Sequence, residues 1–438
     1  VPAPASVPNP ALPRPSSDAT FRAVTLQLPR HRQNVGWILT VEVFWGVSLS
    51  LISMVAILPV FLTHLGANNA AIGTLPVVWI LATSFPGAFS SHFTSHMAHR
   101  KRAVIVLHAI AGIPWVFLAM WFGLAARPTP AADILVFLCV WGGSWVLMGF
   151  TIPVWINFIG KVTRPELRAR SFGTIFFFQT LMGAVGGWVG SRVLGSTIPF
   201  PANYALGFLI AGACMALGSV FFAPVLEEAG ATQEPGRAVT TVLAYAREIL
   251  ADRSGIRVYL SALLLSTGCY LLIPYYPVFA EQRFGLHARD SAIYTAVCMG
   301  GQMLGSVLIG VIGDRWGYAR VAVIAMAALT AGLVLAIWGA HPAFYYATAF
   351  VLGVFLVADR LALYNLSMAF SPHADNTAYL GIVPALVAPL AALVAGSSGA
   401  FIDRFGFIPV AAIGLAGAVS ALYLVVFRLP EPQYSLAG

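Results

Sequence analysis

The stretch GVIGDRWGYARVAVIAMAALTAGLVLAIWG, Gly310 to Gly339, joins a charged turn to a long apolar run. Its first part holds Asp314, Arg315 and Arg320 among glycines, and no charged residue follows Arg320 before Gly339. An apolar run of about 20 residues is long enough to cross the hydrocarbon core of a bilayer as a helix. The stretch therefore predicts a polar loop at a membrane face, followed by a transmembrane helix.

The rest of the chain repeats this alternation of short polar and long apolar segments. Hydrophobic residues make up 59% of the 438 residues and charged residues only 9%, with a mean hydropathy of +0.84. Twelve apolar segments between residues 36 and 428 are each long enough to span a bilayer, and they are too long and continuous for the strands of a barrel. We therefore expect an all-α integral membrane protein with twelve transmembrane helices.

The two halves of the chain echo each other in sequence. LPVFLTHLG at 58–66 resembles YPVFAEQRFG at 276–285, and Arg102 occupies the place of Arg320 at the start of a span. The longest interior polar stretch, Leu226 to Arg257, separates six spans from six. These echoes predict a duplicated six-helix unit. We expect a disordered Pro-rich cytoplasmic tail over 1–35, a six-helix half over 36–225, a cytoplasmic loop with an amphipathic helix over 226–256, a second six-helix half over 257–428 and a cytoplasmic tail over 429–438.

The positive charges lie mostly on one side of this arrangement. Of the 24 Lys and Arg residues, 18 fall in the segments that would share a face with both termini. By the positive-inside rule this places both termini in the cytoplasm, and the net charge of +8 needs no nucleic-acid partner to explain it. Arg greatly outnumbers Lys, which is typical of a GC-rich genome and favours a bacterial inner membrane.

The chain resembles the major facilitator superfamily of secondary transporters. The resemblance rests on twelve spans arranged as six plus six, on a long central loop and on the family's loop motif, which here reads Gly310, Asp314, Arg315, Gly317 and Arg320. A second copy, GAFIDRFG, occupies residues 399–406. The resemblance implies alternating access of a small organic solute, with the loop motif as a conformational latch and the chain functional as a monomer.

Three charged residues lie inside predicted spans, where charges are costly and usually functional. They are Glu42 in span one and the consecutive Asp359 and Arg360 in span ten. The resemblance places spans one, four, seven and ten around the central cavity. Our hypothesis is that Asp359 is a proton-coupling carboxylate and that Arg360 is either its partner or the anchor for an anionic group. A static buried ion pair is the alternative, and Glu42 is either a gate residue or interfacial.

Aromatic residues on the same spans are further candidates for the cavity wall. Such walls suit amphipathic solutes and cations, although lipid-facing aromatic residues are the commoner explanation for any one of them. The candidates are Trp45 in span one, Trp141, Trp145 and Trp155 in span four, Tyr270, Tyr275 and Tyr276 in span seven, and Tyr364, which shares a helix face with Arg360.

A histidine cluster keeps a second class of function open. His92, His96 and His99 recur at helical spacing, so they could share a divalent ion, or they could simply lie at the mouth of a span. The alternatives to an organic-solute transporter are therefore a divalent metal permease and a non-transporting receptor, scaffold or assembly subunit. Phosphate-binding glycine loops and nucleophile elbows are absent from the sequence, so we predict no enzyme activity and no cofactor.

Overall fold

The computed structural model describes residues 17–88, 97–124, 129–164, 168–228, 238–251, 255–371 and 377–432. Within these residues every regular element is a helix, and 12 helical segments are long and apolar enough to cross a membrane. The all-α fold with twelve spans is thus confirmed.

In the described residues of the first half, eight helices build six spans. They are α1 (Ser17–Leu51), α2 (Ile57–His64), α3 (Asn69–Ala88), α5 (Lys101–Ala111), α6 (Ile113–Leu124), α7 (Pro130–Val162), α8 (Arg168–Leu194) and α9 (Ala202–Val220). Helix α1 begins at Ser17, so residues 17–35, which we expected in a disordered tail, are helical instead. Helix α1 therefore continues upstream of the span.

The second half follows a short helix, α10 (Ala238–Ala251), which lies where the amphipathic helix was expected. The second half comprises α11 (Gly255–Leu265), a 3-10 turn η2 (Ser266–Gly268), a π-helical turn η3 (Leu271–Tyr275), α12 (Tyr276–Phe284), α13 (Ala288–Trp316), α14 (Tyr318–Trp338), α15 (Ala343–Ala369), α16 (Thr377–Phe405) and α17 (Phe407–Phe427). Pro274 and Pro277 lack the N–H groups that a regular helix needs, which accounts for the irregular turns in span seven.

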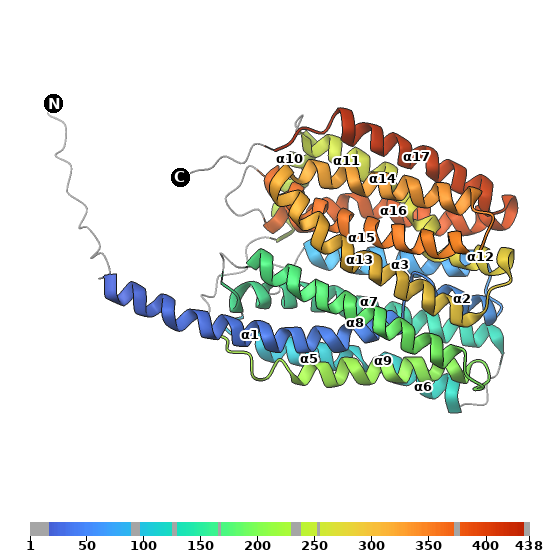
Figure 1. Cartoon of the computed structure of the whole chain (residues 1–438), viewed down its shortest axis with the longest axis horizontal. Coiled ribbons are helices and arrows are strands. Elements are labelled where there is room, and N and C mark those ends of the chain that lie inside the picture. Colours follow the sequence, from blue (N-terminus) through green and yellow to red (C-terminus); the bar gives the residue numbers. More distant parts are fainter. Residues whose placement is uncertain are drawn as a thin grey trace.

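The helices of the two halves lie side by side (Figure 1). The beginning of α5, the beginning of α14 and the end of α17 lie at one end of the bundle, which we call the terminal end. Helices α2 and α12 lie at the other end, which we call the opposite end. Charge placement predicts that the terminal end is cytoplasmic.

Two helix pairs join the halves: α8 packs along α13, and α3 packs along α16. Small residues let these backbones approach closely. A side chain at Gly187 of α8 would overlap Ala296 and the carbonyl of Ala292 on α13, and one at Gly399 of α16 would overlap the carbonyl of Asn69 on α3. Glycine is therefore required where the halves meet.

At the terminal end, a glutamate after the last span of each half binds the beginning of that half's third span. Glu227 accepts hydrogen bonds from the backbone N–H groups of Arg100 and Lys101 at 2.8–3.0 Å and from Lys161 Nζ at 2.9 Å. Glu431 accepts hydrogen bonds from the N–H groups of Tyr318 and Ala319 at 2.8 and 3.1 Å. The matching contacts support the duplication inferred from sequence.

The surroundings of Glu227 favour its charged form. Burial of its side chain, which is 2% exposed, acts to raise the pKa, but the two backbone N–H groups and Lys161 outweigh burial and lower it. A carboxylate at the beginning of a helix also interacts favourably with the helix dipole. Glu227 thus holds spans three, four and six together.

Candidate functional site

Contacts between the halves close the opposite end of the bundle. His64 Nε2 on α2 lies 2.9 Å from Glu281 Oε1 on α12, and Asn69 Nδ2 donates to Asp403 Oδ1 at 2.7 Å. Among the described residues, these two are the hydrogen bonds that join one half to the other. The structure therefore represents a state in which the opposite end is latched.

Glu42 of α1 is buried at the interface with α8. Its residue is 3% exposed, and its Oε2 accepts a hydrogen bond from Gln179 Nε2 at 2.6 Å. The helices come close here because position 46 is glycine, where any side chain would overlap the Gln179 carbonyl. Such burial is not expected of an interfacial glutamate, and it supports a role inside the protein.

Arg360 of α15 reaches the other half of the molecule. Its guanidinium lies over the ring of Phe176 on α8, with 5.4 Å between Cζ and the ring centroid. Within the described part of the chain, Arg360 forms no ion pair. A static buried ion pair between helices, the alternative considered from sequence, is therefore not seen for Arg360 among the described residues.

These residues lie away from the terminal end of the bundle. Counted from the terminal ends of their spans at 1.5 Å per helical residue, Phe176, Gln179, Arg360 and Glu42 lie roughly 8, 12, 14 and 18 Å deep. Phe176 and Gln179 are three residues apart on α8, so they lie on neighbouring positions of one helix face. A row of polar and aromatic groups thus runs from α1 across α8 to α15 inside the bundle.

Asp359 interacts electrostatically with its neighbour Arg360 but forms no ion pair with it among the described contacts. Its Oδ1 is buried and has no hydrogen-bond partner among the described residues. It interacts electrostatically with Tyr259, Cys269 and Tyr270, all on the irregular span seven. An unpaired buried carboxylate oxygen costs free energy unless it binds a proton or another donor.

Trp141 and Tyr276 belong to the core of their own half, whereas Tyr275 lies where α3 and α16 meet, with its hydroxyl against Gly73 of α3. Trp141 is fully buried and donates to the Leu75 carbonyl at 3.1 Å, and Tyr275 donates to the Ala395 carbonyl at 2.7 Å. Tyr276 is 1% exposed and packs beside Tyr345. These three side chains are therefore not brought to the row between the halves.

The remaining aromatic candidates differ among themselves. Trp45 and Trp145 line a small cavity inside the first half, and neither indole N–H has a partner in the part of the chain that the structure describes. Tyr270 packs against the cluster of Ala388, Ala391 and Ala395. Tyr364 is 36% exposed, and Trp155 lies beside Phe176.

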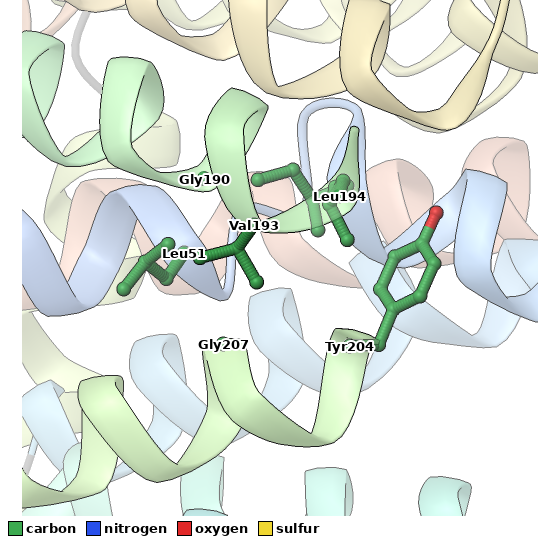
Figure 2. A pocket seen from close by; sticks show the side chains of 7 residues that line it. Leu51, Gly190, Val193, Leu194, Tyr204 and Gly207 are labelled. Carbon is green, nitrogen blue, oxygen red and sulfur yellow. The ribbon is translucent and has the colours of Figure 1, made fainter. Parts of the chain in front are cut away.

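A second cavity lies between α1, α8 and α9 (Figure 2). Its lining includes Leu51, Val193, Leu194 and Tyr204, and no charged side chain contributes to it. The hydroxyl of Tyr204 has no hydrogen-bond partner within the described ranges. Because this cavity lies within the first half, away from the charged row, we do not assign the functional site to it.

The loop-motif residues differ in their surroundings. Gly310 has open space around it rather than a close helix neighbour, and Gly317 adopts φ +92°, which favours glycine at this turn. Arg315 and Arg320 are exposed, and the side chain of Asp314 lies outside the described residues.

The histidine cluster is largely beyond what the structure describes. His92 and His96 lie outside the described residues, and His99 Nδ1 is 3.9 Å from Glu227 Oε2. Among the described residues there is no group of three metal-ligating side chains.

Sequence reasoning missed the partners of the charged residues. Gln179 is an amide within an apolar span, which is a recognisable signal, whereas Phe176 is one of several aromatic residues in FFFQ and carries none. Glu227 and Glu431 each follow the last span of a half, a regularity that the sequence does contain.

The family model described as Major Facilitator Superfamily matches residues 258–437. A point mutant of the nucleoside transporter NupG has a TM-score of 0.68 at 16% identity, covering 89% of this chain and 99% of its own. A POT family transporter in complex with 5-aminolevulinic acid has a TM-score of 0.67 at 12% identity, covering 90% and 94%. A D-xylose-proton symporter has a TM-score of 0.65 at 16% identity, covering 94% and 99%. Comparison with curated proteins gave no sequence match.

Proposed function

We propose that this chain, which has the fold of the major facilitator superfamily and matches that family's model over its C-terminal half, is a secondary active transporter. It moves a small organic solute by alternating access, with the two halves rocking about a site near the middle of the membrane. The observation that carries the proposal is the row of Glu42, Gln179, Phe176 and Arg360, which crosses from one half to the other while the opposite end is latched.

Proton coupling is assigned to Asp359. The carboxylate is buried beside the irregular span seven, and one oxygen has no partner, so gain and loss of a proton would change its interactions strongly. Irregular helices within membranes often lie at the sites of coupling ions and substrates. The proton symporter and the nucleoside transporter with this fold are compatible with such a role, although they share only the fold.

The test uses the purified chain in liposomes with an imposed pH gradient. The vesicles are incubated with a defined mixture of organic acids, amino acids, sugars, nucleosides and divalent metal ions, and the lumen is analysed by mass spectrometry. We expect one class of organic solute to accumulate above empty vesicles, because alternating access coupled to protons concentrates its substrate.

Asp359→Asn should abolish accumulation driven by the pH gradient while leaving exchange of solute across the membrane, because exchange needs no net proton movement. Glu228→Gln, at an exposed site on the terminal end, is the matched control and should behave as the unmodified chain. Undiminished proton-driven accumulation in Asp359→Asn would remove Asp359 from the mechanism. Accumulation of metal ions alone would favour the metal permease, and no accumulation at all would favour a receptor, scaffold or assembly subunit.

A further inference from the structure

We infer that the contact between Arg360 and Phe176 anchors an organic anion with a planar apolar body, so that organic carboxylates are the substrate class. This inference rests on the proposed transport function and names the ligand of the same site.

Arg360 carries its positive charge within a membrane-spanning helix. A guanidinium inside a membrane is costly unless an anion or strong acceptors compensate it. None of the described carboxylates pairs with it. Asp359 precedes it on the helix and projects about 100° away. Glu42 Oε2 is held by Gln179 at 2.6 Å. The Asp359 charge acts on Arg360 at a distance but forms no ion pair with it among the described contacts, so the hydrogen-bond donors of the guanidinium are left for a ligand.

Aromatic rings of the first half form a wall beside the Arg360 guanidinium. Phe176 stacks on Phe172 with ring centroids 6.2 Å apart, and the Trp155 ring lies 6.4 Å from Phe176. These three rings come from α7 and α8 of the first half, whereas Arg360 comes from α15 of the second half. The arrangement places a cation beside a continuous aromatic surface, which suits an anion that also carries a flat apolar group.

The aromatic wall and helix α15 carry further hydrogen-bond donors. The Trp155 Nε1–H is buried and has no partner among the described residues, and Tyr364, one helical turn beyond Arg360, is 36% exposed. The guanidinium and the indole N–H can only donate hydrogen bonds, and the Tyr364 hydroxyl can donate one as well. A planar guanidinium binds a carboxylate through two parallel hydrogen bonds, so a carboxylate fits this set better than a cation or a neutral polyol.

The experiment compares matched aromatic carboxylates and carboxamides in a thermal-unfolding assay of the full-length chain in detergent. The probes are benzoate and benzamide, phenylacetate and phenylacetamide, and indole-3-acetate and indole-3-acetamide. At least one carboxylate should raise the melting temperature while its amide does not, because a ligand that binds only the folded chain stabilises it. Stabilisation by none of the carboxylates, or equally by an amide, would overturn the inference.

Variants locate the site. Arg360→Gln should weaken carboxylate binding by roughly 10- to 100-fold, because it removes a charge-assisted hydrogen-bonding group. Arg360→Lys, which keeps the charge, should restore part of the affinity, and it serves as the informative variant if Arg360→Gln fails to fold. Trp155→Phe keeps the ring but removes the N–H, and should weaken binding several-fold.

The matched control is Arg192→Gln. Arg192 also lies over an aromatic ring, that of Trp188 at 5.3 Å, but at the far end of α8. It should leave carboxylate binding unchanged. Equal loss of binding in Arg192→Gln and Arg360→Gln would show that general charge, and not the site, is responsible.

Failure of this inference can be separated from failure of the proposed function. If vesicles containing the chain accumulate a neutral or cationic solute, and Arg360→Gln still does so, the chain is a transporter but not of organic anions. If no solute of any charge accumulates, the transport proposal fails, whatever the thermal assay shows.

Discussion

Glu227 and Glu228 are adjacent in sequence but differ in what they contact. Glu227 binds two backbone N–H groups and Lys161, whereas Glu228, 80% exposed, contacts only Arg30, itself 56% exposed. Exposed ion pairs contribute little to stability, but buried charge-assisted hydrogen bonds contribute more. Substituting each of these adjacent glutamates therefore compares a buried, hydrogen-bonded carboxylate with an exposed one.

Glu227→Ala should lower the free energy of unfolding by about 1.5–3 kcal/mol at neutral pH, and Glu228→Ala should change it little. Thermal or detergent unfolding of both variants checks this. Because the pKa of Glu227 is lowered in the folded chain, its stabilising effect is complete above its ordinary value of 4.5 and is lost as the pH falls through the lowered pKa. The difference between Glu227→Ala and the unmodified chain should thus shrink below about pH 4.5. A difference that grows in acid would contradict the assignment.

At this scale the sequence identifies the costly residues but not their partners. Glu42, Asp359 and Arg360 can be recognised because charges inside apolar spans are rare. Gln179, the partner of Glu42, is 137 residues away, so only packing of α1 against α8 reveals it. The same holds for Phe176, whose apolar side chain is unremarkable until Arg360 of the other half lies over it.

At the scale of helices, close packing between the halves depends on glycine. A Cβ at Gly187 would lie 2.8 Å from the Ala296 Cβ and N, whereas a Cβ at Gly143 of α7 would meet nothing within 4 Å. Both residues lie inside long helices, so replacing either with leucine improves intrinsic helix propensity equally. The difference between them is the neighbouring helix alone.

Gly187→Leu should therefore destabilise the folded chain by about 1–3 kcal/mol, because the added side chain forces α8 and α13 apart. Gly143→Leu should leave stability unchanged or raise it by up to about 1 kcal/mol. Unfolding measurements on the two variants compare them directly. Equal effects would mean that the α8–α13 contact does not hold the halves together.

Helix positions follow well from hydropathy, but irregularities within spans do not. The spans were expected as single helices, yet span one divides into α1 and α2, and span seven contains 3-10 and π-helical turns. Pro274 marks the second break in the sequence, but a proline alone does not predict a π-helical turn. The tail was also predicted too long, because helix α1 extends back to Ser17.

At the scale of the whole molecule, the duplicated sequence motifs acquire a meaning. The echo between 58–66 and 276–285 corresponds to the end of α2 and to α12, which meet across the halves through His64 and Glu281. Both segments end in a glycine with positive φ, Gly66 and Gly285. Sequence could show that these segments match, but not that they contact each other, since that depends on how the halves dock.

In alternating access the two halves move so that opening one end of the bundle closes the other. Distances between spin labels at each end test it without knowledge of the substrate. One label pair replaces the exposed Asn68 and Gln282 at the opposite end, and another replaces the exposed Arg102 and Arg428 at the terminal end. The background lacks the native Cys139, Cys214, Cys269 and Cys298.

The decisive measurement compares both distances with and without His64→Ala, which removes the contact to Glu281. His341→Ala is the control, because His341 is exposed and accepts a hydrogen bond from the Ala343 N–H within its own half. If the halves alternate, His64→Ala should lengthen the opposite-end distance and shorten the terminal-end distance, while His341→Ala should change neither. Two distances that stay fixed, or that lengthen together, would contradict alternating access about a central site.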